Sequence, residues 1–233
     1  MQEYPQRYHI VKYPVVALLG IIIIISSAVP VVIFSGNTGM QRALEIYVPI
    51  TCTGPDFGFK YLIGTGFTVE PGIVMTAKHV DCGDANITEV SFNHGITWEM
   101  LRPDRKFTAD NLDIKIYHVQ SVHRIRPVKF RQAKLGEQVV GYGVGFDVIG
   151  TTGYVIRTDD TGVYTTNTPA GGMSGSAIVA VSDGAVVGLV SSLQATTAGL
   201  FNYPTSFVTF GIAADRVRET LELLKNREVI SPK

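Results

Sequence analysis

Residues 171–176 read Gly-Gly-Met-Ser-Gly-Ser, and this stretch decides how the rest of the chain is interpreted. Its serine, Ser174, lies between glycines, where the chain can turn tightly and present backbone N–H groups. A serine hydroxyl becomes an effective nucleophile only when a base takes its proton, a third group orients that base, and donors stabilise the oxyanion. A catalytic role for Ser174 therefore requires a histidine and a carboxylate elsewhere in the chain.

Candidates for both partners precede the serine. His79 ends the sequence Thr-Ala-Lys-His, and Asp113 begins the sequence Asp-Ile-Lys-Ile. Histidine, aspartate and serine occur in this order in chymotrypsin-like enzymes. An α/β-hydrolase would place its histidine last and a glycine two positions after the nucleophile, where this chain has Ser176. The order therefore favours a chymotrypsin-like hydrolase over an esterase.

With Gly-Thr-Gly-Phe at residues 64–67, these motifs resemble the trypsin-like peptidases, closest to the bacterial HtrA-type branch, over residues 45–225. The resemblance implies an all-β fold of two six-stranded antiparallel β-barrels with a C-terminal helix. It also implies a serine endopeptidase that hydrolyses polypeptides through an acyl-enzyme and uses no cofactor or metal. The PDZ module that many HtrA-type enzymes carry is not expected, because few residues follow Lys225.

The resemblance also assigns the site residues. His79 is the general base, Asp113 orients it, and Ser174 is the nucleophile. The oxyanion hole is formed by the backbone amides of Gly172 and Ser174. The remaining assignments are substrate contacts: a strand that pairs with the substrate backbone, formed by Val190, Ser191 and Ser192, and the floor of the first specificity pocket at Thr168. A threonine floor carries no charge, so uncharged, small to medium substrate side chains are expected.

Lys78 and Lys115 depart from the family pattern, which usually has small residues at both positions. A Lys78 side chain directed outward would be harmless. Asp110 competes with Asp113 as the orienting carboxylate, but only Asp113 adjoins the apolar alternation of a strand. The other histidines lack a comparable context and are expected to be structural: His9, His94, His118 and His123.

The composition is that of a folded chain with a sizeable core, since 45% of the 233 residues are hydrophobic. Lys and Arg total 20, as do Asp and Glu, and no long run of one charge is present. A nucleic-acid partner is therefore not expected.

Residues 15–34 are uncharged. At about 1.5 Å per residue they could span the roughly 30 Å hydrocarbon core of a bilayer as a transmembrane anchor. Arg7 and Lys12 precede this segment, so residues 1–14 are predicted to be a cytoplasmic tail and the peptidase domain of this single-pass protein to be extracytoplasmic. A cleavable signal peptide, with small residues Ser26 and Ala28 near its cleavage site, is the alternative.

Beyond the anchor, residues 35–42 are small and polar and are expected to be a linker or the start of the domain. Short β-branched runs separated by glycine-rich turns then predict about twelve strands, a count that alone does not separate two barrels from a sandwich. Apolar residues at helical spacing predict one terminal helix. The peptidase domain is placed at residues 43–233, with barrels at about 43–132 and 133–212 and the helix at 213–225.

Cys52 and Cys82 lie on either side of the Gly-Thr-Gly-Phe motif. In an outward-facing protein they could pair, which would stabilise the fold by about 3 kcal/mol. The family often bridges its histidine loop in a similar way, although Cys52 lies further upstream than the usual first partner. Zinc is not expected, because no matched histidine pair accompanies the cysteines.

Two questions stay open at this point. The sequence does not separate an active peptidase from a catalytically inactive, membrane-tethered binding module derived from one. HtrA-like enzymes commonly form trimers, so a homo-oligomer is an expectation by analogy alone, because assembly contacts lie outside the matched motifs.

Overall fold

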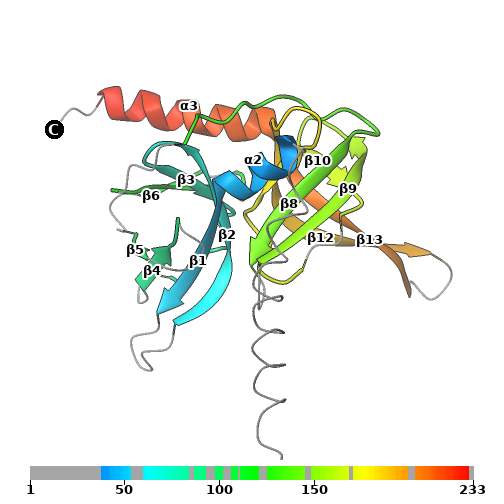
Figure 1. The fold of residues 1–233 in the computed structure, drawn as a ribbon, viewed down its shortest axis with the longest axis horizontal. Helices are drawn as coiled ribbons and strands as arrows, with labels where there is room; N and C mark the ends of the chain where they lie inside the picture. The colour runs from blue at the N-terminus through cyan, green and yellow to red at the C-terminus, as the bar shows by residue number, and fades with distance from the viewer. Residues whose placement is uncertain are drawn as a thin grey trace, which may run out of the picture. The chain divides into compact units, whose positions relative to one another are not determined.

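The computed structural model describes residues 38–53, 60–83, 87–92, 98–101, 106–109, 111–120, 125–144, 148–167, 170–198 and 203–230. Its strands form two antiparallel sheets, which a helix follows (Figure 1). In chain order the elements are α2 (Thr38–Ile46), β1 (Tyr47–Thr53), β2 (Lys60–Glu70), β3 (Ile73–Thr76), β4 (Ile87–Val90), β5 (Glu99–Met100), β6 (Lys106–Thr108), β7 (Lys115–His118), β8 (Gln138–Val144), β9 (Val148–Thr158), β10 (Gly162–Thr165), β11 (Ala177–Ala180), β12 (Val186–Ala198), β13 (Tyr203–Ala213) and α3 (Ala214–Ile230).

The second sheet is a closed barrel with the strand order β10-β13-β12-β11-β8-β9. Pairing of β10 with β9, for example Val163 with Thr158, completes the closure. Valine and isoleucine side chains fill the interior, among them Val139, Val155 and Ile178. β-Branched side chains are stiff and pack well on a pleated surface, which suits the core of a small barrel. The six-stranded barrel expected for residues 133–212 is confirmed.

The first sheet differs from the expected six-stranded barrel of residues 43–132. It has seven strands in the order β5-β4-β1-β2-β3-β7-β6, and within the described residues it is not closed. Closure would require β5 to pair with β6, but β5 has two residues and β6 has three.

Helix α2 begins within residues 35–42, which the sequence predicted to be a linker or the start of the domain. Ala43 and Ile46 are buried in the main core, and Met40 and Leu44 pack against it. Met40, Ala43 and Leu44 do have helical spacing, but a helix of nine residues gives barely two turns of pattern. Such a short helix depends on tertiary packing more than on intrinsic propensity, which is why the sequence did not indicate it.

The terminal helix agrees with the prediction and extends five residues beyond it, to Ile230. Its apolar stripe, Val217, Leu221 and Leu224, is buried in the main core. Lys225 reaches Glu70 of β2 at 3.2 Å, so α3 also contacts the first sheet. No helix in the described ranges is both long and apolar enough to cross a bilayer. The anchor predicted at residues 15–34 lies outside those ranges.

Candidate active site

The candidate base sits on a short turn at the end of β3. Ala77 is fully buried, and the amide of Val80 donates to the carbonyl of Ala77 at 3.0 Å, which closes the turn. His79 lies at its tip with half of its side chain exposed. The neighbouring Lys78 is exposed, so the first departure from the family pattern leaves the packing of this turn unaffected.

The carboxylate of Asp113 is bonded to His79 twice. Asp113 Oδ1 accepts from the backbone amide of His79 at 3.0 Å, and Asp113 Oδ2 lies 2.8 Å from His79 Nδ1. A carboxylate only accepts hydrogen bonds, so the ring proton is on Nδ1 and Nε2 has a free lone pair. This is the tautomer that a general base for a serine requires.

Ser174 lies in a loop that both sheets hold. On the second sheet, the Gly175 amide donates to Val190 O at 2.7 Å, and the Val190 amide donates to Ser176 O at 2.9 Å. On the first sheet, the Thr65 amide donates to Ser174 O at 2.9 Å. The Thr65 hydroxyl donates to the Gly172 carbonyl at 2.6 Å. The Gly-Thr-Gly-Phe motif therefore docks the loop of Ser174 onto β2, which pairs with β3, the strand that precedes the histidine turn.

Two glycines make this docking possible. A Cβ at Gly175, where φ is +85°, would lie 2.1 Å from Thr76 Oγ1 and 2.7 Å from the amide nitrogen of Ala77. A Cβ at Gly64 would lie 2.7 Å from Val80 and 3.1 Å from the carbonyl oxygen of Ser174. The nucleophile loop is thus in direct contact with the turn that carries His79.

The catalytic contacts are only partly formed. Although both side chains are described, no hydrogen bond joins Ser174 Oγ to His79. In the described part of the chain, the amides of Gly172 and Ser174 donate to no protein acceptor, so both remain available to an oxyanion. Unliganded active sites often have loose contacts of this kind.

The predicted substrate strand has a second role. β12 is irregular between Val190 and Ser192, which pair with Gly211 and Phe210, and Ser191 is the extra residue. Bulges of this kind redirect side chains near active sites. The Ser191 hydroxyl donates to Asp113 Oδ2 at 2.7 Å, a contact across the two sheets that the sequence did not reveal. The amide and the carbonyl of Val190, the first of the three predicted residues, are both bonded to the loop of Ser174.

Several sequence candidates lie outside the described residues. They are the predicted pocket floor Thr168, the competing carboxylate Asp110, and the histidines His9, His94 and His123. Among the residues that are described, no group of three or more His, Cys, Asp or Glu side chains could hold a metal ion.

Further bonds hold the histidine turn. Cys52 of β1 and Cys82 form a disulfide, so the turn is tied covalently to the first sheet. Lys115, the second departure from the family pattern, is buried and forms an ion pair with Asp81.

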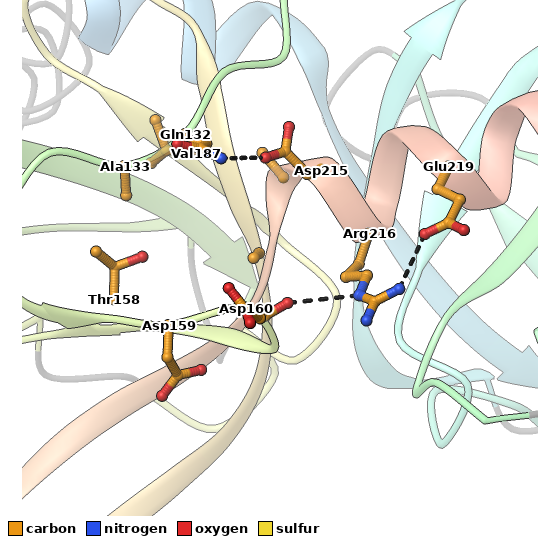
Figure 2. Close-up of a pocket in the computed structure, with 11 residues that line it drawn as sticks. Gln132, Ala133, Thr158, Asp159, Asp160, Val187, Asp215, Arg216 and Glu219 are labelled. Atoms are coloured by element: carbon orange, nitrogen blue, oxygen red, sulfur yellow. Dashed lines mark hydrogen bonds and ion pairs between the residues drawn. The ribbon is translucent and has the colours of Figure 1, made fainter.

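A separate cavity lies at the start of α3 (Figure 2). It has a volume of about 470 Å³, and its lining includes Asp159, Asp160, Asp215, Arg216 and Glu219. Arg216 bonds to Glu219 and to the carbonyl of Asp160, as the dashed lines show. None of the three candidate catalytic residues lines this cavity.

Comparison with known proteins places the chain in a family. A family model described as a trypsin-like peptidase domain matches residues 64–189. No curated protein sequence matches the chain. The serine endoprotease from Yersinia pestis is similar in structure, with a TM-score of 0.62 and 20% identity over 80% of this chain and 65% of that one. Rv3671c from M. tuberculosis H37Rv, in an inactive mutant form, is also similar, with a TM-score of 0.60 and 20% identity. The match covers 82% of this chain and 92% of that one. At this identity the two structures share the fold.

Proposed function

Because the chain belongs to the trypsin-like peptidase family, whose model spans more than half of it, we propose that it is a serine endopeptidase using His79, Asp113 and Ser174. The observation that carries the proposal is the paired bonding of His79 to Asp113, beside a nucleophile loop packed on the same turn. A structural role alone would not require a histidine with a free Nε2 at that place.

The chemistry follows from these atoms. Ser174 Oγ attacks the peptide carbonyl carbon while His79 Nε2 takes the hydroxyl proton, and the carbonyl oxygen becomes an oxyanion. The amides of Gly172 and Ser174 stabilise that charge, and one such donor is typically worth about 3 kcal/mol. His79 returns the proton to the leaving amine, which breaks the C–N bond and leaves an acyl-enzyme. Water then attacks the carbonyl carbon of the ester while His79 Nε2 takes a proton from it. His79 returns this proton to Ser174 Oγ as the ester C–O bond breaks, which frees the enzyme.

Asp113 keeps the imidazolium in place during both steps. Its Oδ2 receives bonds from His79 and Ser191, and its Oδ1 from the His79 backbone. A carboxylate held by three donors is fixed in orientation, so it is placed to stabilise the imidazolium.

The substrate and the location are further parts of the proposal. We infer a polypeptide substrate that adds a strand beside Ser191 and Ser192, with an uncharged side chain before the cleaved bond because Thr168 offers no counter-charge. The uncharged segment 15–34 supports a membrane anchor with the peptidase domain extracytoplasmic. Cleavage of a peptide library strictly after Lys or Arg would contradict the inferred specificity.

A catalytically inactive binding module is the second candidate, and the unformed Ser174–His79 bond favours it. Labelling with a fluorophosphonate separates the two. The proposed peptidase is labelled at Ser174, not at all after Ser174→Ala, and far more slowly after His79→Ala. Folded, unprocessed protein that stays unlabelled, also in the presence of peptides that could activate a latent form, would indicate the binding module.

A further inference from the structure

A buried cation lies two residues after Asp113. The Lys115 side chain is only 4% exposed, and its ammonium is paired with the Asp81 carboxylate. An ammonium taken out of water without a counter-charge is strongly destabilising. The position of Asp81 is therefore constrained by Lys115.

Tyr117 contacts the same carboxylate from the next position on this face of β7. Its hydroxyl donates to Asp81 Oδ1 at 3.5 Å, and Lys115 Nζ lies 5.8 Å from the centre of its ring. Burial first, and then the negative charge of Asp81, raise the pKa of Tyr117, so the phenol stays protonated and remains a donor. Two side chains of one rigid strand thus fix Asp81.

The same two segments carry the bond between His79 and Asp113. Asp81 follows His79 by two residues, and Lys115 follows Asp113 by two. The side chain of His79 is bonded to Asp113, two residues before β7, and the side chain of Asp81 is paired with Lys115, the first residue of β7. The bonds to Asp113 hold the segment at His79 and the disulfide holds it at Cys82, and the ion pair fixes the side chain of Asp81 between these two points. Catalytic side chains need such support, because displacements near 1 Å are costly.

We propose that Asp81 and Lys115 are positioning residues that hold His79 in its catalytic orientation, a role that rests on the proposed peptidase function. Neither side chain touches the reacting atoms. Asp81→Asn leaves the Lys115 ammonium without its counter-charge, and Lys115→Met leaves Asp81 with only the 3.5 Å bond from Tyr117. Both variants therefore remove the ion pair that joins the histidine turn to β7.

Loss of the ion pair should lower kcat and leave KM nearly unchanged. A misplaced general base slows the chemical step, and we expect kcat to fall about 10²-fold in each single variant. The Michaelis constant should stay within about twofold, because no substrate contact is removed. A variant that was merely less stable would show unchanged kcat at temperatures where it is folded.

The deciding experiment observes the proton on His79 Nδ1 by NMR in the full-length protein. In the wild type its bond to Asp113 gives a low-field resonance, and each single variant should exchange that proton with water at least about tenfold faster. The double variant Asp81→Asn with Lys115→Met removes the buried ammonium together with its counter-charge, so its thermal midpoint should recover while exchange stays fast. Arg131→Met is the matched control. It breaks the pairs with Glu137 and Asp183, and should lower the midpoint without changing the His79 resonance.

The proposal is overturned if both single variants keep the wild-type exchange rate of His79. It is equally overturned if the double variant recovers slow exchange together with its thermal midpoint, because the pair would then act through stability alone. This readout needs no turnover. A wild type that shows the resonance but is never labelled at Ser174 would therefore reject the peptidase function without affecting the test of the ion pair.

Discussion

Replacing Asp113 with asparagine should change the tautomer of His79 without changing the shape of the site. The backbone N–H of His79 can only donate, and it faces Oδ1 at 3.0 Å, so the single oxygen of the asparagine must occupy that position. The amide NH₂ then takes the place of Oδ2, 2.8 Å from His79 Nδ1. Nδ1 must become the acceptor, the ring proton moves to Nε2, and the base for Ser174 is lost.

The expected magnitude is a fall in kcat of about 10⁴-fold, which corresponds to about 5.4 kcal/mol of transition-state stabilisation. Ser191→Ala is the control. It removes one hydrogen bond from the same Oδ2 without introducing a donor there, and should cost about tenfold. Both variants are compared by the rate of Ser174 acylation with an activated ester. An Asp113→Asn enzyme within tenfold of the wild type, with unchanged folding, would refute the tautomer reasoning.

Three other perturbations test separate parts of the structure. The double variant Cys52→Ala with Cys82→Ala removes the disulfide between residues that are 30 apart in sequence. The free energy of unfolding should fall by about 3.5 kcal/mol and the thermal midpoint by roughly 7–14 °C. An unchanged midpoint would contradict this. Gly175→Ala should lower the free energy of unfolding by about 3 kcal/mol, because φ is positive there and the new Cβ would collide with Thr76. Gly171→Ala is the control, because a Cβ added there has no atom within 4 Å, so its effect in the same melting experiment should be far smaller. The hydrogen bond from Arg131 holds the pKa of Asp183 below its usual value, so Asp183 contributes stability above about pH 4 that is lost as the pH falls. Arg131→Met should therefore flatten the decline in unfolding free energy on the acid side in urea titrations, and an equally steep decline would count against this pairing.

The candidate catalytic trio could be proposed from the sequence because its signals are local. A histidine after an apolar strand, an aspartate before one, and a serine between glycines each depend on a few neighbouring residues. The structure brings His79 and Asp113 into direct contact and docks the loop of Ser174 on the same turn. The closed second barrel was predictable for a similar reason, since its strands are rich in β-branched residues.

What the sequence missed depends on contacts between distant residues. The bond from Ser191 to Asp113 joins positions 78 apart, and the partner of Lys115 is 34 residues away. Lys115 stood out only as a departure from the family pattern, because nothing adjacent to it in sequence indicates that Asp81 neutralises its charge. The open edge of the first sheet was missed because β5 and β6 are too short to give a periodic signal.

The most direct test is a high-resolution structure of the protein after reaction with a peptidyl phosphonate. We predict phosphorus bound covalently to Ser174 Oγ and a phosphonyl oxygen within hydrogen-bond distance of the amides of Gly172 and Ser174. His79 should remain bonded to Asp113 and turn Nε2 toward the adduct. An adduct on another residue, or an imidazole that leaves Asp113 and points away from Ser174, would contradict a catalytic site shared by the two sheets.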